Sequence, residues 1–258
     1  SIGNAWGEYY VSLEIAQTGP KGAGSVYVAK SNSKPANPNT TATSDKTTSG
    51  ANVAMYWWVD INDGYNVSLT GAVTGGPYSA PSANGSVTLK APTDLTGGTK
   101  TYSATATFVE VTVNSVDAAS KALAPTNPSI DYPFTVTFET SNLKTIALDL
   151  NKSPETTDGK FTITSWAQDG NNVVATGKFN GGGSYGGASR NNSTTLSLQS
   201  KASGSAAKTC TVTANFPALA FVGVEATDVY ATQGESGKTG SATFKYNYAA
   251  EDDFPTTP

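Results

Sequence analysis

The run Phe134-Thr135-Val136-Thr137-Phe138 decides the fold class of this chain. Large apolar side chains alternate with threonine, and a period of two puts one set on a buried face and the other toward solvent, as in a β-strand. β-Branched residues such as threonine also fit a pleated sheet better than a helix. The same alternation recurs in the apolar sets Tyr9/Val11/Leu13/Ile15, Val26/Val28, Val67/Leu69, Val87/Leu89, Phe161/Ile163, Leu196/Leu198, Val212/Phe216 and Phe244/Tyr246/Tyr248.

The composition predicts many short strands joined by turns. The 258 residues include 26 Gly and 13 Pro, which would interrupt almost any helical window. Only residues 117–124 and 219–231 could be helical, and both are too short to supply the crossover helices of a parallel sheet. We therefore predict an all-β fold of two antiparallel β-sandwich domains of the immunoglobulin-like kind.

A change of phase places the boundary between these domains. A continuous strand would move its apolar side chains from one face of the sheet to the other here, so we expect a bulge or a domain junction near residues 108–110. The predicted units are an N-terminal β-sandwich module over 1–108, an immunoglobulin-like sandwich over 109–250 and a disordered tail over 251–258. The two apolar sets are Tyr102/Ala104/Ala106/Phe108 and Val109/Val111/Val113.

Two polar stretches, residues 30–52 and 180–193, are expected to be loops. The first has no aromatic or large aliphatic residue, and the second is rich in glycine. Loops of this length are either mobile tips or binding loops, and the lack of anchoring side chains favours mobile tips.

The residues that are missing exclude several classes of chemistry. The chain has no histidine and one cysteine, Cys210. Histidine-based nucleophilic systems and histidine-ligated metal sites are therefore excluded, as are an intrachain disulfide and a cysteine zinc site. The alternating run around Cys210 predicts a buried small hydrophobe rather than a reactive thiol. We expect no enzyme, no cofactor and no metal site.

The charge pattern bears on partners and on location. The net charge is −4 and the lysines are scattered singly, which argues against nucleic acid as a partner. No apolar run approaches the roughly 20 residues of a membrane helix, so no transmembrane segment is predicted in this chain. Residues 1–6 have no charged or apolar signal region and read as a mature or trimmed terminus.

Carboxylates leave two minor alternatives. A glycosidase needs two carboxylates at a suitable separation, but most acids here lie beside Gly or Asn, where aspartate stabilises turns. The segment Asp60-Ile61-Asn62-Asp63-Gly64 looks like part of a calcium loop but lacks the later bidentate glutamate. A tight turn explains Asp63 and Gly64 without a metal.

The aromatic segment Tyr56-Trp57-Trp58-Val59-Asp60-Ile61 contains the predicted ligand-binding residues. Alternation assigns Trp57 with Val59 and Ile61 to the core, and it leaves Tyr56, Trp58 and Asp60 on the opposite face. Two aromatic rings beside a carboxylate can stack a sugar ring and accept hydrogen bonds from its hydroxyls. The competing interpretation is that Trp58 is covered by a loop or by the second domain.

One part of the sequence resembles a known module. The run Gly19-Pro20-Lys21-Gly22-Ala23-Gly24-Ser25-Val26-Tyr27-Val28-Ala29, followed later by Asp60-Ile61-Asn62-Asp63-Gly64-Tyr65-Asn66-Val67, is similar to a module of secreted and surface proteins of Bacteroidetes. The match covers about residues 9–108, although Leu69-Thr70-Gly71 stands where a Gly-Trp often follows. The resemblance implies a cell-surface or exported role, often in adhesion or glycan contact, and it assigns no catalytic residues. The second half resembles a generic bacterial immunoglobulin-like sandwich.

These observations lead to one functional hypothesis and three alternatives. The hypothesis is a non-enzymatic binding or adhesion protein, secreted or on the cell surface, whose partner is a host or cell-surface protein or glycan. The polar composition, the scarcity of Cys, Met and His, and the resemblance together suggest this extracytoplasmic location. The alternatives are a carbohydrate-binding module of a glycan-utilisation system, a structural surface-layer element and a cryptic glycosidase.

Overall fold

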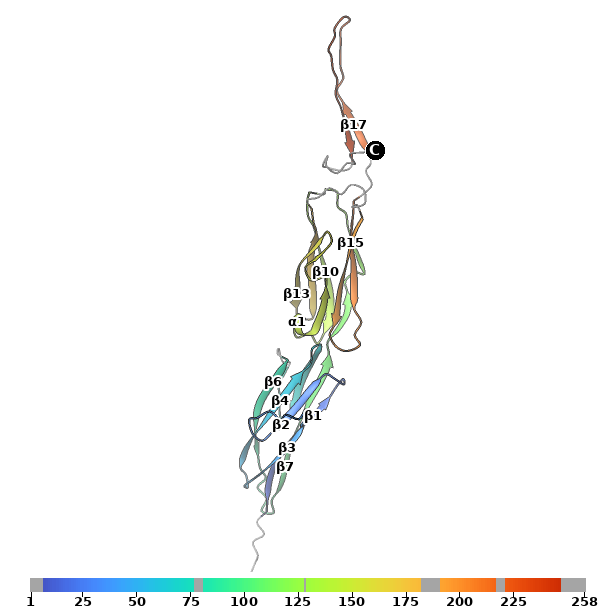
Figure 1. Ribbon diagram of the computed structural model, residues 1–258. Helices are drawn as coiled ribbons and strands as arrows, with labels where there is room; N and C mark the ends of the chain where they lie inside the picture. The colour runs from blue at the N-terminus through green and yellow to red at the C-terminus, as the bar shows by residue number, and fades with distance from the viewer. Residues whose placement is uncertain (1–6, 77–80, 128, 182–190, 217–220, 247–258) are drawn as a thin grey trace, which may run out of the picture.

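The computed structural model describes residues 7–76, 81–127, 129–181, 191–216 and 221–246. Its regular secondary structure is almost entirely β-strand, and Figure 1 shows two successive sandwiches followed by a two-stranded ribbon. Among the described residues, no helix has the length and apolar character needed to cross a membrane. The N-terminal sandwich contains β1 (Tyr9–Thr18), β2 (Gly24–Ala29), β3 (Ala42–Thr47), β4 (Asn52–Ile61), β5 (Tyr65–Gly71), β6 (Ser82–Lys90) and β7 (Gly98–Glu110).

The first sandwich has a four-stranded sheet in the order β3–β1–β7–β5 and a three-stranded sheet in the order β2–β4–β6. Their inner faces follow the alternation in the sequence: Val11, Leu13 and Ile15 of β1 are buried, and so are Val59 and Ile61 of β4. The outer face of β2–β4–β6 is thereby left for the alternate residues, including those predicted to bind a ligand.

The second sandwich has the strand order of an immunoglobulin fold. One sheet is ordered β12–β13–β14–β10–β8 and the other β11–β15–β16–β9. Across the first sheet, β8, β10, β14 and β13 occupy the A, B, E and D places of that fold. Across the second sheet, β11, β15 and β16 occupy the C, F and G places. The strands are β8 (Thr112–Val116), β9 (Ser120–Leu123), β10 (Tyr132–Ser141), β11 (Leu150–Ser153), β12 (Thr157–Asp158), β13 (Phe161–Asp169), β14 (Asn172–Phe179), β15 (Asn191–Ser200) and β16 (Lys208–Asn215).

The predicted all-β fold of two sandwiches is confirmed. Most neighbouring strands are antiparallel as predicted, but each sandwich also contains a parallel pair, β1 with β7 and β9 with β16. Alternation reports which face of a strand is buried and carries no information on the direction of its neighbour. The parallel pairs therefore required the tertiary structure.

One local prediction differs from the structure, and the two stretches that could have been helical are not helices. Residues 117–124 contain β9, and the described residues 221–231 contain β17 (Phe221–Ala226). The predicted loop at residues 30–52 contains β3, an edge strand paired with β1. Its sequence, Ala-Thr-Ser-Asp-Lys-Thr, has no large apolar residue to mark a buried face. A single helical turn, α1 (Ile146–Asp149), begins after Thr145, whose hydroxyl accepts a hydrogen bond from the Leu148 amide at 3.2 Å.

The chain changes sandwich between Phe108, in the first core, and Val111, in the second. The second sandwich ends earlier than the predicted residue 250: its last strand stops at Asn215, and β17 pairs with β18 (Ala242–Tyr246) in a sheet of their own. The apolar alternation of the ribbon resembles that of a core strand, which is why the sequence assigned it to the second unit. The predicted tail at 251–258 lies outside the described residues.

A buried ion pair joins the two sandwiches. Lys144 and Asp149 of the second sandwich lie 3.3 Å apart, and their side chains are 3% and 0% exposed. The Lys144 ammonium donates to the backbone carbonyl of Tyr65 in the first sandwich, and Asp149 accepts from the Gly64 amide at 3.3 Å. Ala202 of the second sandwich is buried in the first core. We call these five residues the junction cluster.

Gly64 allows this close approach. Its φ is +88°, in the left-handed region that favours glycine, and a Cβ there would lie 2.2 Å from the amide nitrogen of Ala202. The Tyr65 hydroxyl accepts a hydrogen bond from the Ser203 amide at 3.2 Å on the same side. The turn after β4 is thus packed directly on the turn after β15.

Candidate functional site

The outer face of the β2–β4–β6 sheet carries the predicted ligand-binding residues. Trp57 is buried with the core of the first sandwich, whereas Tyr56, Trp58 and Asp60 lie on the opposite face and are each half-buried. Alternation along β4 therefore assigned each side chain to the face on which the structure places it. The sheet supplies the platform, because no other sheet of the described residues packs on this side.

Strand register brings further side chains beside the two rings. Trp58 lies between Tyr27 of β2 and Asn84 of β6, and Tyr56 lies next to Ser86. Asn84 and Ser86 are exposed. We call the group Tyr27, Tyr56, Trp58, Asn84 and Ser86 the aromatic face. Tyr27 is 8% exposed, so the rings that can stack on a flat ligand are those of Tyr56 and Trp58, beside an amide and a hydroxyl that can exchange hydrogen bonds with it.

Asp60 has a partner that sequence analysis did not identify. The Lys34 ammonium lies 2.7 Å and 2.8 Å from the two carboxylate oxygens of Asp60. It also lies 4.5 Å from the centroid of the Tyr27 ring, within reach of a cation–π interaction. Lys34 therefore closes one side of the aromatic face and neutralises the carboxylate. A ligand that uses Asp60 as an acceptor must share it with Lys34.

The sequence contained a clue to Tyr27 but not to Lys34. Tyr27 stands between Val26 and Val28, so alternation on β2 puts it on the outer face. Lys34 is 26 positions from Asp60 in a polar stretch with no periodicity. Asn84 and Ser86 required the register of β4 against β6, which the sequence does not specify.

The acidic residues near the aromatic face do not form a cluster. Asp60 pairs with Lys34, while the carboxylate of Asp63 lies 4.0 Å from the ammonium of Lys201 in the second sandwich. The Asn62 amide donates to the backbone carbonyl of Gly22 at 2.6 Å. In the described part of the chain, no three acidic, cysteine or histidine residues gather as a metal site would require.

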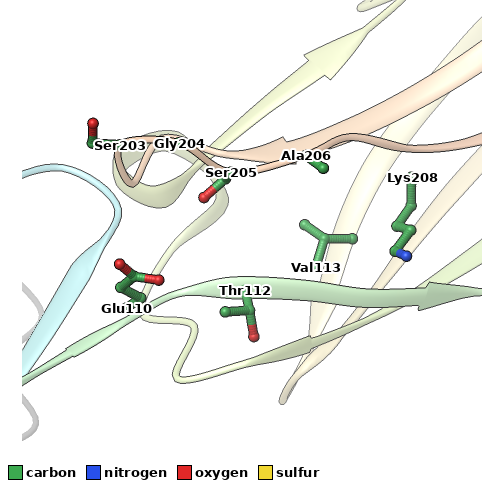
Figure 2. Close-up of a pocket in the computed structure, with 8 residues that line it drawn as sticks. All are labelled: Glu110, Thr112, Val113, Ser203, Gly204, Ser205, Ala206 and Lys208. Atoms are coloured by element: carbon green, nitrogen blue, oxygen red, sulfur yellow. The ribbon is translucent and has the colours of Figure 1, made fainter.

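A cleft of about 260 Å³ lies on one side of the junction between the sandwiches. Figure 2 shows Thr112 and Val113 of β8 along one wall and the turn of residues 203–206 along the other, with Glu110 and Lys208 toward opposite ends. Its volume is just below the usual range of small-molecule sites. Glu110 is the one carboxylate in its lining, so the cleft lacks the pair that a glycosidase needs.

A second cleft, of about 410 Å³, is lined by amide side chains of both sandwiches. Asn66 donates to the carbonyl of Asn142 at 3.4 Å, and Asn142 donates to the carbonyl of Glu110 at 2.9 Å. Asn171 accepts from the Leu143 amide at 3.3 Å. These amides already bond to backbone groups across or beside the junction, so they stabilise the contact between the sandwiches.

The remaining reactive or aromatic candidates have structural roles. Cys210 is fully buried in the second core, and burial raises the pKa of its thiol. Trp166 donates its indole N–H to the carbonyl of Pro154 at 3.1 Å and packs on Phe138, with ring centroids 5.9 Å apart. Neither side chain is placed to meet a ligand.

Comparison with known proteins assigns neither a family nor a function to this chain. No protein family matches the chain, and no curated protein matches it. Among solved structures, one similar chain is Drosophila N-cadherin EC1-4, at 8% sequence identity and a TM-score of 0.28. The similarity covers 82% of this chain and 76% of that one. At this TM-score it supports no statement about function.

Proposed function

We propose that this chain is a non-enzymatic binding or adhesion protein of the cell surface or the secreted space, and that it binds its partner on the aromatic face. The observation that carries the proposal is the pair Tyr56 and Trp58, half-buried on a sheet face that no other sheet in the described part of the chain covers. Aromatic side chains of this size are usually covered, and partly exposed aromatic side chains that gather on one face mark an interaction surface.

A glycan is the ligand class that the chemistry of this face favours. Tyr56 and Trp58 offer ring faces for stacking, and the neighbouring Asn84 and Ser86 offer donors and acceptors for hydroxyls. The Lys34–Asp60 pair is neutral as a unit, so the face suits an uncharged sugar better than an acidic one. A carbohydrate-binding module is therefore the second candidate function.

The junction cluster supports a scaffolding role for the second sandwich. Its side chains are buried and hydrogen-bonded across the boundary, so the two sandwiches are held at a fixed angle rather than on a free linker. An extended, fixed array suits a protein that presents a binding face at a distance from its attachment. The same rigidity would serve a purely structural surface-layer element.

The first experiment is a glycan array with the wild-type chain, repeated with calcium and with chelator. We expect calcium-independent binding to neutral glycans, and loss of that binding in Trp58→Ala. Tyr10→Ala is the matched control, because Tyr10 is a half-buried aromatic residue on the outer face of the other sheet.

The outcomes separate the candidates. Equal loss in Trp58→Ala and Tyr10→Ala would show a general effect on folding and would remove the aromatic face as the site. Binding that survives Trp58→Ala would place the site elsewhere. A clean negative on the array, with Trp58→Ala still blocking adhesion to a protein-coated surface, would favour a protein partner over a glycan.

A further inference from the structure

The outward side chains of β4 form a row on the aromatic face. Alternation along the strand places Ala54, Tyr56, Trp58 and Asp60 on the side opposite the core. Neighbours in this row are about 7 Å apart, twice the rise per residue of a strand. The two rings are therefore spaced as successive positions along one line rather than as the two walls of a pocket.

A row of polar side chains on β6 runs beside the aromatic row. The register of β4 against β6 puts Ser86 opposite Tyr56 and Asn84 opposite Trp58. Both polar residues are exposed, and Thr88 continues their row on the same face. Cβ atoms directly opposite each other on an antiparallel pair lie about 4.5–5.5 Å apart. A ligand that lies on the rings therefore meets one amide or hydroxyl beside each ring.

The polar groups of both rows have no partner within the described residues. This is true of the Tyr56 hydroxyl, the Trp58 indole N–H and the side chains of Asn84 and Ser86. On the outer face of the other sheet, by contrast, the Tyr10 hydroxyl donates to a neighbouring carboxylate at 2.9 Å. The aromatic face thus keeps donors and acceptors available along its length, where a ligand can use them.

The aromatic row is closed at one end and open at the other. Beyond Trp58, the Lys34 ammonium lies 2.7 Å from the Asp60 carboxylate and 4.5 Å from the centroid of the Tyr27 ring. At the other end, Ala54 is exposed and its side chain ends at Cβ. A chain-like ligand can therefore continue over Ala54 but meets an ion pair past Trp58.

We propose that the aromatic face binds an extended, neutral β-1,4-linked glycan lengthwise along β4, with one sugar over Trp58, the next over Tyr56 and the chain continuing over Ala54. This inference rests on the proposed function and adds the shape and the direction of the ligand. An extended glycan presents the faces of successive sugars in line, so two of them can stack on two rings of one row. An α-1,4-linked glycan coils away from such a row.

The test is isothermal titration calorimetry of the wild-type chain with cello-, xylo- and manno-oligosaccharides of one to six sugars, and with malto-oligosaccharides as the coiled comparison. In at least one β-1,4-linked series, the second sugar should lower Kd roughly 2- to 10-fold, the gain from one further aromatic contact. Longer members should add little, because Ala54 offers no ring. The malto-oligosaccharides should show no such gain.

Two substitutions test the direction of the glycan. Tyr56→Ala should abolish the gain from the second sugar. Ala54→Trp adds a ring to the open end of the row, so the third sugar should now lower Kd by a similar factor, and loss of folding cannot produce this result. Ala16→Trp is the matched control: Ala16 is an exposed alanine of β1, in the other sheet, and the same change there should leave every Kd as in the wild type.

Each contrary result has a separate meaning. Equal Kd values for one and two sugars, with binding still lost in Trp58→Ala, would overturn the row and leave a single-sugar site, so the proposed function would stand. No gain from the third sugar in Ala54→Trp would overturn the direction along β4. Equal binding of the malto-oligosaccharides would overturn the extended shape. Failure of all three β-1,4-linked series to bind would overturn this inference alone if the glycan array is positive, and the glycan-binding function with it if the array is negative.

Discussion

Replacing one partner of the Lys144–Asp149 pair should destabilise both sandwiches at once. In Lys144→Met, the Asp149 carboxylate stays buried and loses its only cationic partner among the described residues, but it still accepts from the amides of Gly64, Lys144 and Thr145. Removing one partner of a buried pair costs about 3–5 kcal/mol. The surviving amide bonds put Lys144→Met near the lower value, at about 3 kcal/mol.

Asp149→Leu should cost more, because it leaves those three amides without their acceptor and buries the Lys144 ammonium unpaired. We expect about 5 kcal/mol for this change. The double variant Lys144→Met/Asp149→Leu contains no lone buried charge. Its loss should therefore be smaller than the sum of the two single losses.

Urea unfolding followed by tryptophan fluorescence measures these effects, since Trp57 and Trp58 report on the first sandwich and Trp166 on the second. A loss of 3 kcal/mol corresponds to a fall in Tm of roughly 6–12 °C when the two sandwiches unfold together as one cooperative unit. The control is Lys30→Met, which breaks the exposed Lys30–Asp45 pair and should change stability very little. A loss below about 1 kcal/mol in Lys144→Met, or full additivity in the double variant, would refute the assigned role of the buried pair.

Three further predictions concern single side chains. Gly85→Val should cost about 1–3 kcal/mol and alter the near-ultraviolet circular dichroism of Trp57, because a Cβ at Gly85 would lie 2.6 Å from the Trp57 ring; an unchanged spectrum and stability would contradict this. Cys210 should react with a thiol reagent only in urea, since burial raises the pKa of its thiol, and rapid labelling of the native chain would disprove the assignment. The hydrogen bond from Lys178, together with one from a backbone amide, lowers the pKa of Asp131. The ionised carboxyl therefore stabilises the fold at pH values above its pKa in the unfolded chain. This stabilisation is lost as the pH falls through its lower pKa in the folded chain. Asp131→Asn should accordingly flatten the acid limb of a Tm-against-pH curve, and parallel curves for wild type and variant would argue against the contribution.

The sequence by itself determined the class of fold and the face of each core strand. The period of two along β4 separated Trp57 from Tyr56 and Trp58, because successive side chains of a strand point to opposite sides. The reversal of phase after Phe108 marked the place where the chain leaves one core for the next, since a buried face cannot change sides within one strand. These features depend on residues that are neighbours along the chain, so the sequence alone predicts them.

The tertiary structure alone decided which distant residues meet. Lys34 reaches Asp60 from a polar stretch, and the polar strand β3 pairs with β1. Neither contact is predicted by an apolar pattern in the sequence. Lys144 and Asp149 look like ordinary solvated charges in the sequence, yet they are buried where Gly64 lets the first sandwich approach the second. Burial of a polar residue depends on which surfaces come together in space. That is why the junction cluster became visible only in the folded chain.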